Sequence, residues 1–567
     1  MSEPARRPQA AHAPGHLLWA PQAWLPGGWQ AQVLLRIGAD GHWAEITPDT
    51  PQPPAGATVL AGPLLPGLVN AHSHAFQRAF AGMAERRETA ADDFWSWRQR
   101  MYRVALRISP AQMQAIAAQL YLELLRGGYT QVCEFHYLHH QPGGQPYADP
   151  QTMAWALADA AQEVGIGLTL MPALYQRAGF AQPTLHDDQR RFATGPAGVW
   201  AAAQRIAERA AAQAAGVTGA SAHPAHPAIP PATGAAATAR PAPLNAGLVI
   251  HSLRAAAPEA IHQLRDLAAG FAGPIHIHAS EQTAEVDDCL ARTGQRPIEW
   301  LAGQGLLDAR WQLVHATHTV PAEIDAVARS GAGVVICPST EANLGDGLCD
   351  LRGWLDAGVP LAIGSDCHIT RDWREELRWL DYGQRLRLGQ RNVAASPASG
   401  QPGTAQRLFE RALAGGAQAA GQRHWGLRVG ARADGLVADA ACSSWVGIPP
   451  ERWLDAMVFS SPARPWQAVM VAGRWACGGG GDGTAGARDA GHAEHAQPEQ
   501  PAQNADNSHN ADNADNAHSS NSSNSSHSSH SSHSSDNAHN THRAHRAITE
   551  RFAQAMAGLW SASTAGD

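Results

Sequence analysis

Short apolar runs alternate with longer segments between residues 61 and 430. The runs have the length of buried strands, and the segments between them include helical patterns such as that of residues 111–128. Strands that alternate with helices indicate a parallel sheet. The number of runs favours a (β/α)8 TIM barrel, with a doubly wound open sheet as the alternative. The expected barrel strands are residues 64–71, 129–135, 166–174, 246–252, 274–279, 311–317, 332–338 and 360–365.

The two ends of this region are flanked by β-like runs of a different kind. Residues 15–60 contain apolar runs broken by Gly, Pro and Asp, with a hairpin expected at the Gly-Ala-Asp-Gly turn of residues 38–41. Similar runs return at residues 434–440 and 467–475. The expected organisation is therefore a small β-sandwich-like domain built from residues 1–60 and 430–476, and a barrel of residues 61–429 inserted into it.

Two segments lack the periodicity of a packed element. Residues 216–243 are rich in Ala and Pro and predict a flexible surface insertion. Residues 477–546 are Gly-rich and then rich in Ser, Asn and His, a composition that predicts disorder. A C-terminal helix is expected over residues 547–567. Its apolar face would consist of Ile548, Phe552, Met556, Leu559 and Trp560.

Composition excludes several kinds of chemistry. All 42 basic residues are arginine, so no lysine can form a Schiff base, complete a phosphate loop or bridge two metals as a carbamate. The net charge of −8 argues against a nucleic acid partner. Seven dispersed cysteines without a C-x-x-C pair, no secretory signal and no apolar run of membrane-spanning length predict a cytoplasmic protein without a membrane partner.

Histidines and carboxylates gather at the ends of the expected strands. His72 and His74 end the first strand, and residues at i and i+2 of a strand point to the same side. The fifth strand carries His276 and His278, followed by Glu281. His315 and His318 end the sixth strand, and Asp366 ends the eighth. A closed barrel brings these ends around one mouth, where barrel active sites lie, so a metal centre is predicted there.

This combination of motifs resembles the amidohydrolase superfamily. The resemblance implies that His72, His74, His278 and Asp366 are metal ligands and that Glu281, His315 and Asp366 are catalytic. Because the chain lacks a bridging lysine, one ion per chain is favoured, as in the deaminases of the superfamily. Imidazole and carboxylate ligands suit Zn²⁺, although such sites accept other divalent metals.

A narrower resemblance rests on a set of segments. NAHSHAFQRA, FWSWRQRMY, CEFHYLHH, HSLRA, HIHASEQ and STEANLGDG together are similar to the formimidoylglutamate deiminase family of histidine degradation. The resemblance implies a hydrolase acting on C–N bonds other than peptide bonds, which converts N-formimidoyl-L-glutamate and water to N-formyl-L-glutamate and ammonia. It also implies a homodimer. No role is assigned to Glu341, Asn343 or Asp346 of the last segment.

Such a substrate carries two carboxylates that the protein must bind. Arginine forks do this bidentately, and Arg254 is the first candidate and Arg98 the second. Tyr137 can add a hydroxyl donor, and Gln77 can bond the formimidoyl group. The alternatives are a surface amide for Gln77 and a salt-bridged helix face for Arg98.

Asp366 is expected to accept the proton of the attacking water, His315 to orient that water, and Glu281 to deliver a proton to the departing nitrogen. Two other functions stay open. One is a guanine or adenosine deaminase of the same superfamily. The other is a metal-storage protein with an inactive barrel, because ten histidines lie within residues 477–546.

Overall fold

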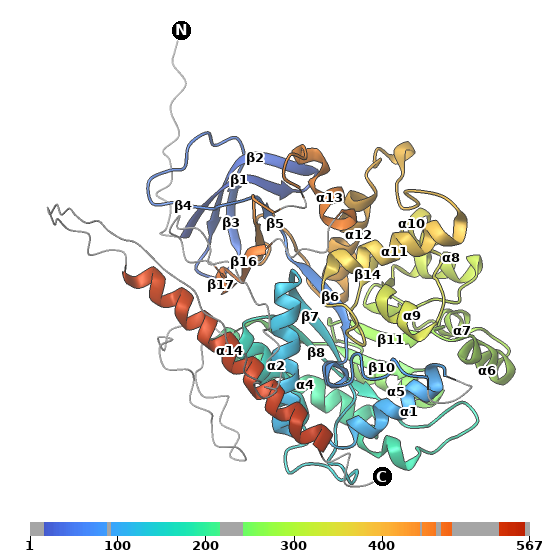
Figure 1. Cartoon of the computed structure of the whole chain (residues 1–567). Helices are drawn as coiled ribbons and strands as arrows, with labels where there is room; N and C mark the ends of the chain where they lie inside the picture. The colour runs from blue at the N-terminus through green and yellow to red at the C-terminus, as the bar shows by residue number, and fades with distance from the viewer. Residues whose placement is uncertain are drawn as a thin grey trace, which may run out of the picture.

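The computed structural model describes residues 16–87, 92–215, 242–442, 445–460, 466–478 and 532–561. Eight parallel strands form its centre in the order β14-β13-β12-β11-β10-β8-β7-β6 (Figure 1). The first and last of them meet through a parallel bridge between Ser73 and Asp366. The predicted barrel is therefore confirmed, and the open sheet is wrong. The strands are β6 (Leu68–Ser73), β7 (Tyr129–His136), β8 (Gly167–Leu174), β10 (Leu248–Ser252), β11 (Ile275–Ala279), β12 (Trp311–His315), β13 (Gly333–Ile336) and β14 (Leu361–Ile363); β9 (Leu244–Ala246) pairs with β8.

Helices connect successive strands and surround the barrel (Figure 1). In α2, Ser109 caps the first turn, Pro110 occupies the first helical position, and the Gln112 side chain bonds back to the cap. The helices are α1 (Phe94–Ala105), α2 (Pro110–Arg126), α3 (Thr152–Val164), α4 (Pro196–Ala214), α5 (Pro258–Leu267), α6 (Thr283–Thr293), α7 (Pro297–Gly303), α8 (Pro321–Ser330), α9 (Pro338–Leu344), α10 (Leu351–Asp356), α11 (Trp373–Leu388), α12 (Thr404–Ala419) and α13 (Trp453–Phe459).

The expected strand of residues 64–71 is in fact two strands that belong to different sheets. Leu64–Leu65 (β5) pairs with β1 and β15 of the small sheet, whereas β6 begins at Leu68 in the barrel. Pro66 and Gly67 separate them. A Cβ atom at Gly67 would lie 2.3 Å from Thr130, so glycine is required where the chain crosses between the sheets.

The small unit is one sheet built from both ends of the chain, as predicted. Its strand order is β17-β16-β15-β5-β1-β2-β3, and β4 also pairs with β1. The expected hairpin at residues 38–41 joins β2 to β3. The sheet packs on a core of its own, around Leu18, Val33 and Trp43. The strands are β1 (His16–Leu25), β2 (Gly28–Ile37), β3 (Trp43–Thr47), β4 (Thr58–Val59), β5, β15 (Gly435–Ala438), β16 (Trp466–Val471) and β17 (Arg474–Cys477). The domain boundaries stay predictions.

The C-terminal helix α14 spans Ser532–Ser561 and lies along α2 (Figure 1). It begins inside residues 477–546, the range for which disorder was expected. Composition alone does not show that a helix extends beyond the turns that pack on the barrel. Ile548 and Leu559 are buried against the barrel core, and the other residues of the expected apolar face are partly buried there. Most of the two predicted flexible segments, residues 216–241 and 479–531, lies outside the described residues. Among the helices described, none is long and apolar enough to cross a membrane.

Candidate metal centre and substrate pocket

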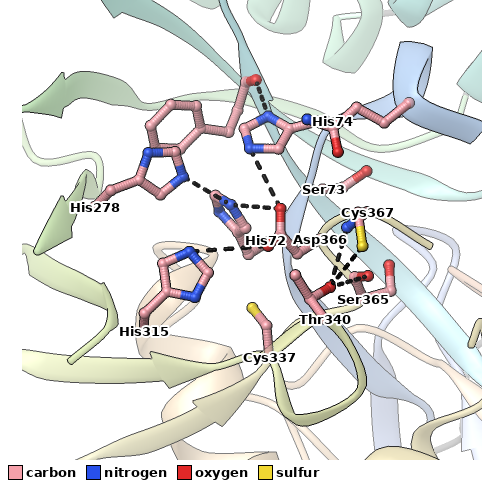
Figure 2. A network of polar contacts seen from close by, with 12 residues as sticks. His72, Ser73, His74, His278, His315, Cys337, Thr340, Ser365, Asp366 and Cys367 are labelled. Atoms are coloured by element: carbon pink, nitrogen blue, oxygen red, sulfur yellow. Dashed lines mark hydrogen bonds and ion pairs between the residues drawn. The ribbon is translucent and has the colours of Figure 1, made fainter. Parts of the chain in front are cut away.

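The four predicted ligands converge at the carboxyl end of the barrel (Figure 2). His72 lies in β6 and His278 in β11, while His74 and Asp366 follow the ends of β6 and β14. All four side chains are buried. They come from three strands that are distant in sequence, and barrel closure brings them together.

The ligand atoms of His72, His74 and Asp366 lie close enough together to hold one metal ion, and His278 approaches this group through His72. Oδ1 of Asp366 lies 3.4 Å from Nε2 of both His72 and His74. Nε2 of His278 lies 3.1 Å from Nε2 of His72. Two nitrogen ligands of one tetrahedral zinc ion lie about 3.3 Å apart, because Zn–N bonds are about 2.0–2.1 Å long.

The protonation of the histidines also fits a metal. Burial lowers the pKa of His72, His74 and His278, that of His74 to about 3, so the rings are neutral as ligation requires. Nδ1 of His74 lies 3.0 Å from the carbonyl oxygen of Phe135, which places the proton on Nδ1 and a lone pair on Nε2. That lone pair faces the Asp366 carboxylate. A cation between these two electron-rich atoms accounts for their approach.

His315 ends β12 and lies beside this cluster. Its Nε2 is 3.8 Å from Oδ2 of Asp366 and 3.6 Å from Oε1 of Glu281. Its Nδ1 is 3.4 Å from Oε1 of Glu341. Burial alone would lower the pKa of His315, but the three carboxylates raise it to about 10. The cluster thus holds an imidazole that these carboxylates keep protonated when no metal cation is bound.

Two residues of the cluster have unusual backbone conformations. His315 has a φ of +71° and Asp366 a φ of +43°, in the left-handed region that side chains with a Cβ rarely adopt. Such residues cost about 1–3 kcal/mol each and persist where the surrounding structure holds them. Their occurrence at the ends of β12 and β14 supports a functional role for this end of the barrel.

Two of the predicted substrate residues, Gln77 and Tyr137, lie next to the proposed ligand His74. Gln77, in the 3₁₀ turn Ala75–Ala79, is buried and its Nε2 donates to the hydroxyl of Tyr137 at 3.2 Å. The ring of Tyr137 lies 5.0 Å from the ring of His74. The alternative of a surface amide for Gln77 is therefore wrong, although its contact with substrate stays a prediction.

The two predicted arginines, Arg98 and Arg254, both place their guanidinium groups near the ring of Trp95. The guanidinium of Arg98 lies 4.5 Å from the ring of Trp95, and that of Arg254 lies 5.5 Å from it. Arg254 is buried. Within the described ranges, Nη1 of Arg254 and Nε of Arg98 have no hydrogen-bond partner, and neither residue forms an ion pair. The alternative of a salt-bridged face for Arg98 has no support in that part of the chain.

Two residues close to the proposed ligands and to Tyr137 were not expected from the sequence. His251, in β10, places its ring 4.9 Å from that of His278 and 5.4 Å from that of Tyr137. Tyr175 lies 4.5 Å from His251 and accepts a hydrogen bond from Gln189. Active-site residues of a barrel lie at the carboxyl ends of its strands. This criterion, which applies to Arg254 in HSLRA, also applies to His251 of that segment.

Glu134 was also not predicted from the sequence, although it binds the residues on both sides of the proposed ligand His74. It lies in β7, and its carboxylate accepts hydrogen bonds from the Ser73 hydroxyl at 2.7 Å, the Ala75 amide at 2.6 Å and the Tyr121 hydroxyl at 3.3 Å. Ser73 and Ala75 flank His74. Burial raises the pKa of Glu134 to about 8. The motif CEFH contains Glu134, but its partners become visible only in the fold.

The remaining candidates lie outside the ligand cluster. Nε2 of His276 meets the carbonyl oxygen of Ala419 at 2.9 Å, deeper in the barrel. Asn343 donates to Glu85 on the surface at 2.8 Å, and Asp346 accepts a hydrogen bond from Gln282. Asn343 lines a small cavity together with Gln77. Burial raises the pKa of Asp346, which lies close enough to Glu281 for that carboxylate to raise it further.

Comparison with known proteins agrees with this geometry. The model of the Amidohydrolase family matches residues 64–476. Formimidoylglutamate deiminase of Pseudomonas aeruginosa is 45% identical over 459 residues, which cover 81% of this chain and 94% of the relative. An 8-oxoguanine deaminase of the same species is 26% identical over 347 residues, 59% of this chain and 67% of that protein.

Solved structures show the same architecture. An amidohydrolase of Brucella melitensis superposes with a TM-score of 0.71 at 37% identity, over 81% of this chain and 94% of that one. An adenosine deaminase of Xanthomonas campestris with bound zinc, at 21% identity, gives a TM-score of 0.61 over 82% and 93% of the two chains and shows the likeness in fold. From its barrel, its cluster of metal-binding side chains and these matches, the chain belongs to the amidohydrolase family.

Proposed function

We propose that the protein is a zinc-dependent hydrolase that converts N-formimidoyl-L-glutamate and water to N-formyl-L-glutamate and ammonia, a step of histidine degradation. The observation that carries this proposal is the pair of guanidinium groups whose charges act on His251, a residue whose ring lies 4.9 Å from that of the proposed ligand His278. Its support from outside the site is the 45% identity to formimidoylglutamate deiminase of P. aeruginosa.

The arginines indicate an acidic substrate. Leaving a charged guanidinium buried without a partner costs several kcal/mol. Nη1 of Arg254 is buried without a hydrogen-bond partner among the described residues, although the carboxylates of Glu285 and Glu281 outweigh the effect of burial and raise the pKa of its guanidinium. Nε of the half-buried Arg98 is also without a partner there. Glutamate derivatives carry two carboxylates, which arginine forks bind bidentately. A neutral purine would leave both groups unpaired.

We propose His72, His74, His278 and Asp366 as the ligands of one Zn²⁺ per chain. When bound, zinc would lower the pKa of a water molecule toward neutrality and so supply the nucleophile. Other divalent metals suit the same donors.

The side chains around the ligands would carry the proton transfers. Asp366 accepts the proton of the attacking water, and His315 orients that water and stabilises the tetrahedral carbon. Glu281 delivers a proton to the departing nitrogen; burial raises the pKa of its carboxyl group, which lies 3.6 Å from Nε2 of His315. The C–N bond breaks, ammonia leaves, and the new C=O bond makes the formyl product.

The remaining side chains would bind and orient the substrate. Arg254 and Arg98 hold its carboxylates, and Tyr137 donates a hydroxyl hydrogen bond. Gln77 bonds the formimidoyl group, which its position beside Tyr137 supports.

Ammonia release from a panel of substrates tests the proposal. Zinc-loaded enzyme is expected to release ammonia from N-formimidoyl-L-glutamate at least about 10²-fold faster, in kcat/KM, than from guanine, adenosine or cytosine. Faster turnover of a purine would favour the second candidate function, a purine deaminase. The match to 8-oxoguanine deaminase supports that alternative.

We further propose a cytoplasmic homodimer that binds neither nucleic acid nor membrane. Among the described residues, Cys133, Cys289, Cys337, Cys349, Cys367 and Cys477 form no disulfide, as expected in a reducing compartment. The homodimer rests on the family resemblance. Light scattering of the purified protein would measure twice the chain mass of 60.0 kDa if it is correct.

A further inference from the structure

A cysteine thiol lies next to the proposed zinc ligands and has no part in the proposed reaction. Cys337 directly follows β13 and is buried. Its Sγ, a ring nitrogen of His315 and a carboxylate oxygen of Asp366 all lie within 4.8 Å of one another. Figure 2 shows the sulfur directed from the strand end toward the other two side chains.

This trio faces a different part of the Asp366 carboxylate from the first ligand set. Oδ1 lies 3.4 Å from His72 and His74, whereas Oδ2 lies 3.8 Å from His315. Asp366 can therefore bridge two positions, one through each oxygen. Thiolate, imidazole and carboxylate together form a donor set that suits zinc, cobalt and cadmium.

The charge around the trio favours a second cation. The carboxylates of Glu281 and Glu341 lie 3.6 and 3.4 Å from the two ring nitrogens of His315. Both carboxylates are buried. They add negative charge that would offset repulsion between two dications in the same mouth.

We propose that His315, Cys337 and Asp366 form a second, weaker position for a thiophilic divalent cation, and that its occupation inhibits the enzyme. The thiol and the protonated ring of His315 each release a proton to solvent as the sulfur–metal and nitrogen–metal bonds form. His315 then holds a metal and can no longer orient the water. The binding part of the proposal is independent of the substrate, whereas the inhibition rests on the proposed function.

Cobalt absorption tests the binding without reference to activity. Enzyme that carries one tightly bound zinc per chain is titrated with Co²⁺, and bound metal is counted by equilibrium dialysis. Wild type should take up a second ion and develop a thiolate-to-cobalt absorption band. Cys337→Ser should keep the first zinc and lose the band. Cys367→Ser is the matched control, because its thiol is buried beside Asp366 but contacts Thr340, so the band should persist.

Absence of the band in wild type, or its persistence in Cys337→Ser, overturns the proposal. If neither Cys337→Ser nor Cys337→Ala folds, X-ray absorption of cobalt-loaded wild type is measured instead. A cobalt coordination shell without sulfur would contradict the proposal. In the activity assay, Cys337→Ser should require at least about 10-fold more free zinc for half inhibition than wild type, because one of three ligands is lost. A protein that shows the band but no deiminase activity would refute the proposed function and leave the metal position intact.

Discussion

The main-chain nitrogen of Asp366 donates a hydrogen bond to the main-chain oxygen of His72 at 3.0 Å. This bond joins the end of the last barrel strand to the first. Closure of the barrel therefore also brings the two proposed ligands His72 and Asp366 together. It also accounts for the left-handed backbone at Asp366, where φ is +43°. We infer that metal binding and barrel stability are coupled.

Removing the metal should therefore destabilise the protein. A ligand at 100 times its Kd stabilises the native state by about 2.7 kcal/mol, so chelated protein should unfold at a clearly lower temperature. Asp366→Asn should retain less than one tightly held ion per chain. Asp308→Asn, in a partly exposed ion pair with Arg310, is the control and should retain it. Calorimetry and elemental analysis measure both effects. Equal melting temperatures with and without chelator would contradict the coupling.

Glu281→Gln and His315→Asn should keep the tightly bound metal but lose about 10²-fold or more in kcat, because each removes an acid–base or orienting group next to the reaction. His262→Asn replaces an exposed histidine that contacts Gln304 and serves as the control. Steady-state kinetics on metal-counted enzyme give the result. Turnover within a few-fold of wild type would refute the role of the residue concerned.

Glu134→Gln should loosen the turn that carries His74. The amide offers a donor where the Ser73, Ala75 and Tyr121 groups need acceptors. We expect a loss of about 1–3 kcal/mol in the free energy of unfolding and about 10–100-fold in zinc affinity. Tyr121→Phe removes only the longest of the three bonds and should affect zinc affinity less. Urea unfolding and zinc competition with a chelator test this. Unchanged affinity in Glu134→Gln would make Glu134 a core residue without influence on the metal.

Much of the fold follows from local pattern. The apolar runs give the barrel strands because buried parallel strands are continuous in hydrophobicity, and the strand-end rule then selects His72, His278 and Asp366. The split of residues 64–71 does not follow, because one apolar run serves two sheets, and only the pairing of β5 with β1 and β15 separates them.

Parts of the site depend on contacts between distant residues. In the sequence, Glu134 is a single acidic residue within an expected strand. Its role appears only in the fold, where Ser73 and Ala75 donate hydrogen bonds to it. His251 was not among the expected site residues, and its place in the site appears only when its ring is seen 4.9 Å from that of His278. The start of α14 at Ser532 lies in a Ser- and His-rich tract whose composition gives no helical signal.

Arg254→Met tests most directly whether Arg254 binds a substrate carboxylate. Because a buried charge pair would be broken, kcat/KM for N-formimidoyl-L-glutamate should fall about 10²-fold or more. An uncharged formamidine needs only the metal centre and should be affected much less. Arg265→Met, on an exposed helix face next to Asp266, is the control. Both substrates are measured on all three proteins. A selective loss on the charged substrate is the predicted result; equal losses on both, no loss on either, or wild-type preference for the uncharged substrate would contradict it.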